Sequence, residues 1–490
     1  MNRAPRAGIK GVPSRVTTGQ GMGSAVRSYA CGCQAARPTK KTAYIALGSN
    51  LGDRVAEIEK ACHLMDKRGI RVMRTSSLYE TEPMYVKEQD RFVNGACQVE
   101  TDLTPLELLD QLQAIENEMG RHKVIDKGPR NIDLDVLLYG DESFTHERLN
   151  IPHIGIRERE FVLRPLAEIA ASKSLEPSRP WKLIQDYLNE LPRGETLSSL
   201  TPLSPSSHTL TPTLPRKTTQ VMAILNLTPD SFSDGGLHDP QSLVETVRGF
   251  IRDGASMVDI GGQSTAPNRP QASAEEELAR ILPSIEVIRS MPEARDIVIS
   301  IDTYRASVAE KALAVGADII NDVSAGALDP EMLPTVARLG KTICLMHMRG
   351  TPETMNKLTS YPDGLIPTVA SELAARVAAA EAAGIRRWRI ILDPGVGFAK
   401  TMEQNLEILR RMEDLRHWPG LENLPWLVGA SRKKFIGRIT GVDKPSERTW
   451  GTAATVAAAV QGGADVVRVH DVPEMTAVTK MADAIWRRLS

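Results

Sequence analysis

The sequence has few cysteines and no long apolar run. Its five cysteines are odd in number and none forms a C-x-x-C pair, so neither a disulfide framework nor a zinc site is indicated, and we expect a reducing compartment. No window offers about 18 uninterrupted apolar residues, which excludes a membrane-spanning helix. A formal net charge of -1 gives no basis for nucleic acid as the main partner. We therefore expect neither membrane nor nucleic acid as a partner.

Acidic residues are absent from the start of the chain. Eight Lys or Arg residues and no Asp or Glu precede Asp53, and the same stretch carries Ser and Ala. This composition is typical of a mitochondrial transit peptide, which we assign to residues 1–41. The alternative is a basic tail that is never cleaved, on a cytosolic protein.

The chain is too long for a single hydrophobic core, and its composition shows where it divides. At 490 residues, two or three domains are expected. Fourteen of the twenty residues from Thr196 to Pro215 are Ser, Thr or Pro, which predicts an extended linker without a core. We therefore predict one domain at 42–195, a linker at 196–219 and a second domain at 220–490.

The second domain repeats one short pattern eight times. Apolar runs bounded by turn residues begin at Val221, Ser256, Ile297, Asp318, Thr342, Arg389, Trp426 and Asp465. Most intervals between them are rich in Ala, Glu and Leu with a helical period, which indicates alternating strands and helices. Eight such units predict a (β/α)8 TIM barrel, whose active site lies at the C-terminal ends of its strands.

Polar side chains follow nearly every one of these runs. Any one of them alone would more often be a helix cap or a turn residue, but their agreement over eight runs indicates a site. Three suit the edge of a flat heterocycle: Asp302, Asn321 and Asp393. Five suit a phosphate-bearing group: Thr265, Ser431, Lys433, Arg468 and His470. Asn226 offers a neutral oxygen to Mg²⁺.

The first domain carries two carboxylates on one face of a predicted strand. In the segment G-P-R-N-I-D-L-D-V-L-L-Y-G, residues 128–140, Asp133 and Asp135 project to the same side because side chains alternate along a strand. Neighbouring carboxylates repel each other unless a cation lies between them, so we expect Mg²⁺; a solvated edge strand is the alternative. A basic set suited to a triphosphate accompanies them: Arg121, Arg130, Arg148, His153 and Arg159. Groups suited to a planar substrate are Phe92, Asn94 and Phe161.

The motifs of the second domain resemble those of dihydropteroate synthases from end to end. They include NLTPDSFSDGG, DIGGQST, INDVSAG, LDPGVGFAK, GASRKKFIG and VRVHD, in that order. The resemblance implies condensation of a dihydropterin diphosphate with p-aminobenzoate, with release of diphosphate. It implies a pterin site that includes the catalytic pair Asp393 and Lys433, together with Asp302 and Asn321. It also implies a diphosphate site of Asn226, Thr265, Arg468 and His470, with Asn226 on Mg²⁺, and a p-aminobenzoate site of Phe398 and Ser431.

One position departs from the pattern of the synthases. Ala266 stands where related sequences usually carry Arg in an S-T-R-P motif. Arg269 lies three residues further along, and whether it supplies the missing charge is left open. Two rival functions are a pterin-binding barrel that transfers methyl groups and a catalytically inactive barrel that serves as a binding module for an active kinase. Ala266 favours the second of these rivals.

The motifs of the first domain resemble 6-hydroxymethyl-7,8-dihydropterin pyrophosphokinase. They are ALGSNLGDR, YETEP, FVNGA, GPRNIDLDVLLYG and IPHIGIREREFVLRPLAEI. The resemblance implies a ferredoxin-like α+β fold, a two-metal site on Asp133 and Asp135, and transfer of diphosphate from ATP with loss of AMP. It implies that the ATP phosphates are held by Arg121 and Arg130, which are also catalytic, and by His153 and Arg159. Pterin contacts would come from Thr81, Phe92, Asn94 and Phe161.

Together the two resemblances imply a bifunctional enzyme of folate biosynthesis, because the product of the first reaction is the substrate of the second. The composition of residues 1–41 places this enzyme in a mitochondrial setting. We expect Mg²⁺ as the cofactor and ATP, hydroxymethyldihydropterin and p-aminobenzoate as small-molecule partners. Association of two chains through the barrel domain is left open. Fungal relatives often carry a dihydroneopterin aldolase domain ahead of the kinase, and we expect that activity to be absent here because few residues precede residue 42.

Overall fold

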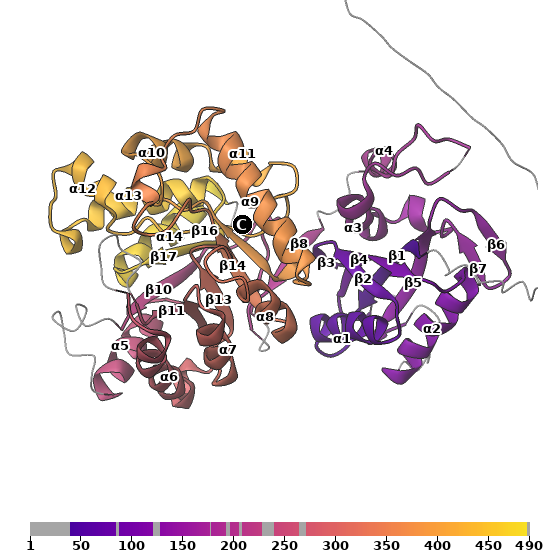
Figure 1. Ribbon diagram of the computed structural model, residues 1–490, viewed down its shortest axis with the longest axis horizontal. Coiled ribbons are helices and arrows are strands. Elements are labelled where there is room, and N and C mark those ends of the chain that lie inside the picture. Colours follow the sequence, from indigo (N-terminus) through magenta and orange to yellow (C-terminus); the bar gives the residue numbers. More distant parts are fainter. Residues whose placement is uncertain are drawn as a thin grey trace, which may run out of the picture. The chain divides into compact units, whose positions relative to one another are not determined.

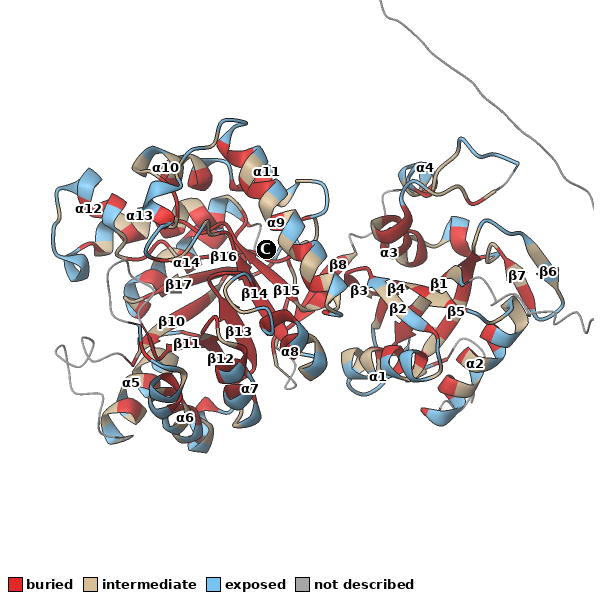
Figure 2. Ribbon diagram, viewed as in Figure 1, coloured by how far each residue is buried: buried red, intermediate tan, exposed pale blue. Residues whose placement is uncertain are grey.

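Residues 40–84, 88–120, 128–176, 178–192, 197–204, 208–227, 240–263 and 271–487 are described by the computed structural model. The chain from Lys40 onward clusters as one compact unit. It contains an antiparallel sheet with its helices, followed by a parallel barrel (Figure 1). The strands of both sheets are largely buried, and the helices around them carry exposed residues (Figure 2). Among the described residues, no helix is both long and apolar enough to cross a membrane.

The N-terminal sheet has β-α-β-β-α-β connectivity. Its core strands lie in the order β5 (Asp133–Tyr139), β1 (Lys41–Ser49), β4 (Phe92–Thr101) and β3 (Leu78–Thr81). β2 (Arg71–Thr75) pairs with the other end of β4, and the hairpin β6 (Phe144–His146) and β7 (Leu149–Ile151) follows β5. This connectivity and strand order are those of the ferredoxin-like fold, which confirms the predicted α+β class.

Helices form cores on both faces of this sheet because its strands carry apolar residues on both sides. Ala43, Ile45 and Leu47 of β1 share one core with α1 (Arg54–Lys67) and α2 (Pro105–Glu118). The alternate residue Tyr44 belongs to a second core with η1 (Ile156–Glu158), α3 (Glu160–Ala170) and α4 (Ile184–Glu190). Helix α1 begins directly after the G-S-N-L-G-D turn, because the Asp53 carboxylate accepts a hydrogen bond from the Ala56 amide at 3.0 Å.

The Ser-, Thr- and Pro-rich segment is not the extended, coreless linker that its composition predicts. Within it, β8 (Ser198–Pro202) pairs with β3 of the N-terminal sheet and with β9 (Thr209–Leu210). Leu203 and Leu210 pack in one apolar cluster with a single residue from each barrel strand, for example Met222 and Cys344. The prediction fails because paired backbone groups and two leucines fix a segment whose other residues are mostly polar.

Eight parallel strands form the C-terminal barrel, as predicted. They are β10 (Gln220–Asn226), β11 (Met257–Gly261), β12 (Val298–Asp302), β13 (Ile319–Asp322), β14 (Thr342–Met346), β15 (Ile390–Asp393), β16 (Leu427–Val428) and β17 (Val466–Val469). The strand order is β15-β14-β13-β12-β11-β10-β17-β16. A parallel bridge between Leu392 and Trp426 joins the two edge strands and nearly closes the barrel.

An outer ring of helices covers the barrel. The main helices are α5 (Pro240–Arg252), α6 (Ala274–Ser290), α7 (Ala306–Ala314), α8 (Met332–Leu339), α9 (Leu365–Ala382), α10 (Met402–Arg410), α11 (Met412–Arg416), α12 (Lys434–Thr440), α13 (Thr449–Gln461) and α14 (Val472–Trp486). Short 3-10 turns are η3 (Pro292–Ala294), η4 (Met355–Lys357), η5 (Arg387–Arg389) and η6 (Pro445–Glu447). The apolar faces of the helices and strands form one continuous core.

The turn η5, just before β15, packs on the N-terminal domain. Trp388 is fully buried in the same core as α1, and its Nε1 donates a hydrogen bond to Glu59 Oε1 at 2.9 Å. Arg389 donates to both oxygens of Glu59, at 2.7 and 2.8 Å. Because β15 ends at Asp393, this contact joins the N-terminal domain to a strand that carries a predicted site residue.

Candidate active sites

A cavity of about 250 Å³ lies against the N-terminal sheet. It gathers nine of the predicted residues: Thr81, Phe92, Asn94, Arg130, Asp133, Asp135, His153, Arg159 and Phe161. Arg121 lies outside the described residues. Arg148 is not brought to the cavity: it donates to Asp110 of α2 at 2.5 Å and lies apart from the described residues that form the lining. That Arg148 contacts the ATP phosphates therefore stays a prediction.

The register of β5 against β1 brings the two carboxylates to the cavity. Asp133 and Asp135 lie opposite Gly48 and Ala46 and are partly exposed, whereas Leu134 between them is buried. A Cβ atom at Gly48 would lie 3.4 Å from Asn94 Oδ1 and 3.6 Å from Asp133 Cβ. Glycine at this position therefore keeps open the space between the amide and the carboxylate.

Arg130 lies beside both the carboxylates and the aromatic wall of this cavity. Its Nη1 is 3.2 Å from Asp133 Oδ2, and its guanidinium carbon is 5.5 Å from the centre of the Phe92 ring. Asn50 fixes the backbone of Arg130 through two hydrogen bonds. The Asn50 side-chain Oδ1 accepts from the Arg130 backbone N–H at 2.8 Å, and the Asn50 backbone N–H donates to the Arg130 carbonyl oxygen at 3.0 Å. The Gly48–Arg54 turn thus positions Arg130. The turn has no phosphate-binding loop motif, so its sequence does not indicate this role.

The donors around this cavity fit magnesium bound together with a nucleotide. Among the described residues, no group of three or more His, Cys, Asp or Glu side chains forms a complete protein metal site. Asp133 and Asp135 supply two hard oxygen ligands, and Mg²⁺ usually takes one or two carboxylates and completes its shell with water and substrate phosphates. The cationic Arg130 and Arg159 line the same cavity, where those phosphates would lie.

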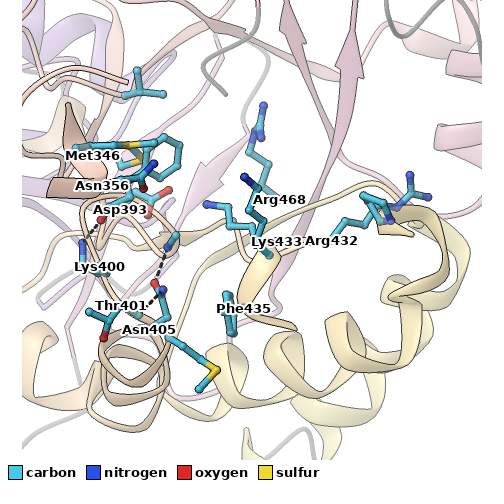
Figure 3. Close-up of a pocket in the computed structure, with 18 of the residues that line it drawn as sticks. Met346, Asn356, Asp393, Lys400, Thr401, Asn405, Arg432, Lys433, Phe435 and Arg468 are labelled. Atoms are coloured by element: carbon cyan, nitrogen blue, oxygen red, sulfur yellow. Dashed lines mark hydrogen bonds between the residues drawn. The ribbon is translucent and has the colours of Figure 1, made fainter. Parts of the chain in front are cut away.

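A larger cavity, of about 930 Å³, lies at the C-terminal ends of the barrel strands. It gathers eight of the predicted residues: Asn226, Asp302, Asn321, Asp393, Phe398, Lys433, Arg468 and His470. Figure 3 shows Asp393, Lys433 and Arg468 around this space. Ser431 is buried next to it, with its Oγ 3.0 Å from His470 Nδ1. Thr265, Ala266 and Arg269 lie outside the described residues, so whether Arg269 supplies the missing loop charge stays open.

Asp259 is a site residue that our sequence analysis missed. It lies on β11, is fully buried, and its Oδ2 accepts hydrogen bonds from Asn321 Nδ2 at 3.0 Å and Arg468 Nε at 2.5 Å. Arg468 Nη2 also donates to Asp302 Oδ2 at 2.9 Å. Arg468 therefore organises the carboxylates of the predicted pterin site, in addition to any contact with diphosphate. The signal for Asp259 was a charged residue inside the apolar run SMVDIGG, because a buried charge is rarely left unpaired.

Two family models match the chain, one over each domain. The model described as 7,8-dihydro-6-hydroxymethylpterin-pyrophosphokinase (HPPK) matches residues 44–171, and the model described as pterin binding enzyme matches residues 222–470. The "Folate synthesis bifunctional protein, mitochondrial" of Arabidopsis thaliana is 42% identical over 480 residues, a match that covers 92% of this chain and 84% of that protein. The chain belongs to the family of bifunctional folate synthesis proteins.

Relatives of this folate synthesis family differ in length. The "Folic acid synthesis protein fol1" of Pneumocystis carinii is 46% identical over 468 residues, covering 91% of this chain but 60% of that protein. The chain thus spans about 60% of the length of this fungal relative. A crystal structure of Plasmodium falciparum HPPK-DHPS with pteroate superposes with a TM-score of 0.76 at 23% identity, covering 92% of this chain and 98% of that one. At this identity the match shows a shared fold.

Burial shifts the pKa values of the ionisable groups that line the barrel cavity. Burial raises the pKa of Asp302 to about 7, against the opposing pull of Arg468, and it also raises the pKa of Asp393. Burial lowers the pKa of Lys433 to about 8 and that of His470 to about 3. His470 is therefore neutral near pH 7 and can meet a phosphate group through a hydrogen bond.

Proposed function

We propose that the chain catalyses two consecutive steps of folate synthesis. The N-terminal domain transfers diphosphate from ATP to 6-hydroxymethyl-7,8-dihydropterin, and the barrel condenses that product with p-aminobenzoate to give 7,8-dihydropteroate and diphosphate. The observation that carries the proposal is that two separate cavities each gather residues of the corresponding motifs, nine in one and eight in the other. The family membership of the chain supports the same pair of activities.

In the first step the protein acts by positioning and by charge neutralisation. The side chains of Phe92, Phe161 and Asn94 hold the pterin, with Asn94 Nδ2 donating to Thr81 Oγ1 at 2.8 Å so that the Asn94 carbonyl oxygen keeps a defined direction. Arg130, His153 and Arg159 hold the ATP phosphates, and Arg121 is proposed to join them. The hydroxymethyl oxygen attacks the β-phosphorus and AMP leaves.

Mg²⁺ is the metal proposed for both steps. Asp133 and Asp135 would hold it in the first cavity, and Asn226 would hold it in the second, where it would neutralise phosphate charge when bound. The residues of this chain carry the rest of the task. In the first cavity, Arg130 lies 3.2 Å from Asp133 and so keeps one carboxylate oriented before any ligand binds.

In the second step the leaving group is diphosphate and the carbon that it leaves is attacked by the amine of p-aminobenzoate. Asp302, Asn321, Asp393 and Lys433 bind the pterin ring, and the carboxylates stabilise the positive charge that develops as the C–O bond breaks. His470 and Arg468, with Thr265, face the diphosphate. Phe398 forms a wall for p-aminobenzoate, and Ser431 fixes His470 through the 3.0 Å contact.

The test follows the two products separately. The purified chain is incubated with hydroxymethyldihydropterin, ATP, Mg²⁺ and p-aminobenzoate, and AMP and dihydropteroate are quantified over time. Both should form, with dihydropteroate dependent on p-aminobenzoate. Formation of AMP without dihydropteroate would favour the rival in which the barrel only binds. If neither product forms, the proposal is overturned.

We also propose a mitochondrial location with a transit peptide at 1–41. The acid-free, basic composition of that stretch supports it, as does the word mitochondrial in the name of the Arabidopsis relative, although the Pneumocystis relative is not so named. A fluorescent protein should enter mitochondria when it is fused to residues 1–41, and it should stay in the cytosol when it is fused to a chain that lacks them. Cytosolic fluorescence from both fusions would support the alternative.

Association of two chains through the barrel domain is tested by the mass of the purified chain in solution.

A further inference from the structure

The loop from Gly395 to Ala399 links β15 to α10 and carries Phe398 into the barrel cavity. Its backbone turns sharply, with positive φ angles of 67° at Gly395, 85° at Gly397 and 48° at Ala399. A Cβ atom at Gly395 would lie 1.9 Å from the His347 carbonyl oxygen, so the loop passes directly against the end of β14. Such a backbone keeps its shape only when its polar groups find fixed partners.

Lys400 provides partners for three acceptors at once. Its Nζ lies 3.1 Å from the Gly395 carbonyl oxygen, 3.2 Å from the Phe398 carbonyl oxygen and 2.9 Å from His347 Nδ1. The protonated ammonium group has three donors, so all of them are used, and the side chain is buried. Burial lowers the pKa of Lys400 to about 7, against the opposing charge of Asp393. Figure 3 shows Lys400 next to the loop that follows Asp393.

His347 is in turn oriented from the other side. Its Nε2 lies 2.8 Å from Glu372 Oε2, and Glu372 is also paired with Arg349 at 2.6 Å. Burial lowers the pKa of His347 to about 4, so the imidazole is neutral near pH 7. The tautomer that satisfies both contacts carries its proton on Nε2 and accepts from Lys400 at Nδ1. Glu372, His347 and Lys400 therefore form one directed chain of hydrogen bonds that ends on the loop.

Other groups of the loop contact site residues on its two sides. The Val396 carbonyl accepts from Lys433 Nζ, and Lys433 lies 4.4 Å from the centre of the Phe398 ring. The Gly395 amide donates to Asp393 Oδ1 at 2.7 Å. A shift of the loop would therefore displace Phe398 directly, whereas Asp302 and Asn321 stand on other strands and would keep their places.

We propose that Lys400, oriented by His347, is a positioning residue that holds the Gly395–Ala399 loop in the shape required to bind p-aminobenzoate. The proposal rests on the synthase function proposed above. Without the ammonium group, the Phe398 carbonyl and His347 Nδ1 lose the partner that Lys400 supplies, and the Gly395 carbonyl keeps only the Phe398 amide, at 3.0 Å. The loop is then held less firmly. p-Aminobenzoate must then order the loop as it binds, which weakens its binding. The dihydropterin diphosphate has most of its contacts elsewhere and is affected less.

The experiment measures both Michaelis constants of the full chain with dihydropterin diphosphate supplied. In Lys400→Met, KM for p-aminobenzoate should rise about tenfold or more, while KM for the diphosphate substrate changes less than about threefold. Lys400→Gln, which keeps two donors, should fall between this variant and the unmodified chain. Lys311→Met is the matched control, because it makes the same substitution at an exposed position on α7.

Each outcome separates the proposal from the function on which it rests. An unmodified chain that makes no dihydropteroate contradicts the proposed synthase function. A Lys400→Met enzyme with unchanged KM for p-aminobenzoate, or with equal increases in both constants, overturns the positioning role. If Lys400→Met does not fold, as judged by its thermal unfolding, Lys400→Gln decides: a KM for p-aminobenzoate within twofold of the unmodified value overturns the proposal.

Discussion

The Arg468 guanidinium pairs with Asp302 at the C-terminal end of the barrel, with 2.9 Å between Nη2 and Oδ2. Its Nε donates at the same time to the fully buried Asp259. One cation therefore offsets a fully buried and a partly buried carboxylate, and it fixes the direction of Asp302 before a substrate binds. Asp259 therefore acts on the site through Arg468, although it is not one of the described residues that line the cavity.

The first prediction concerns Asp259. Asp259→Ala should destabilise the chain by about 1–3 kcal/mol, because the partly buried Arg468 loses one of its two carboxylate partners and keeps Asp302. Dihydropteroate formation should fall by about 10²-fold as Asp302 and Asn321 lose their fixed directions. Chemical unfolding and the synthase rate measure the two effects. Glu310→Ala, which breaks an exposed pair with Arg338, should leave both nearly unchanged, and an Asp259→Ala variant that behaves like it would refute the role of Asp259.

The second prediction uses the raised pKa of Asp302. Burial holds this pKa at about 7, above its ordinary value of 3.8, so the folded chain keeps a proton that the unfolded chain has already lost. The unfolded state therefore binds fewer protons between about pH 4 and 7, and this carboxyl lowers stability as pH rises through that window. Asp302→Asn removes the ionisation. The free energy of unfolding of the variant, relative to the unmodified chain, should increase from pH 4 to pH 7 and then level off; a pH-independent difference would contradict the shift.

The third prediction separates two arginines that the sequence placed in one set. Arg159 lines the kinase cavity, whereas Arg148 pairs with Asp110 outside it. Arg159→Ala should raise KM for ATP or lower AMP formation by about tenfold or more, because a charge-assisted phosphate contact is lost. Arg148→Ala should cause a smaller loss, because the Arg148 guanidinium is paired with Asp110 and does not line the cavity among the described residues. A larger loss in Arg148→Ala than in Arg159→Ala would reverse the assignment.

The fourth prediction concerns the segment between the domains. Leu203 packs against the barrel strands in a buried cluster, whereas Leu214 in the same segment is 36% exposed. Leu203→Ala should lower the free energy of unfolding by about 2–5 kcal/mol, through lost burial and the cavity left behind. Leu214→Ala is the matched control and should cost much less. Equal effects of the two substitutions in denaturant unfolding would favour the extended linker without a core that the composition predicts.

The sequence was sufficient for both folds because their patterns are regular. Eight apolar runs with helical intervals predict the barrel, and the strands β10–β17 begin within a few residues of those runs. The alternation around Asp133 and Asp135 likewise predicts two carboxylates on one face, which β5 provides. These features follow from backbone periodicity, which is visible locally in a single sequence.

The errors and omissions arise from contacts between distant residues. Arg148 lies among motif residues in the sequence, yet Asp110 on α2 is its partner in the fold. The composition of the segment 196–219 hides the pairing of β8 with β3, which depends on a strand more than a hundred residues earlier. Lys400 contacts His347, 53 residues away, and no local pattern joins them. Partners of this kind are set by tertiary packing, which periodicity and composition do not encode.

The central claim, that one chain carries two independent active sites, is tested most directly by mixing two inactive variants. Asp135→Asn should form no AMP but should make dihydropteroate from supplied dihydropterin diphosphate. Lys433→Ala should form AMP while its dihydropteroate output falls by about 10²-fold or more, the loss expected for a preorganised charge. From hydroxymethyldihydropterin, ATP, Mg²⁺ and p-aminobenzoate, each variant alone should give little dihydropteroate, and the mixture should restore its formation. A mixture that stays as inactive as the separate variants, although each keeps its single predicted activity, would contradict the account.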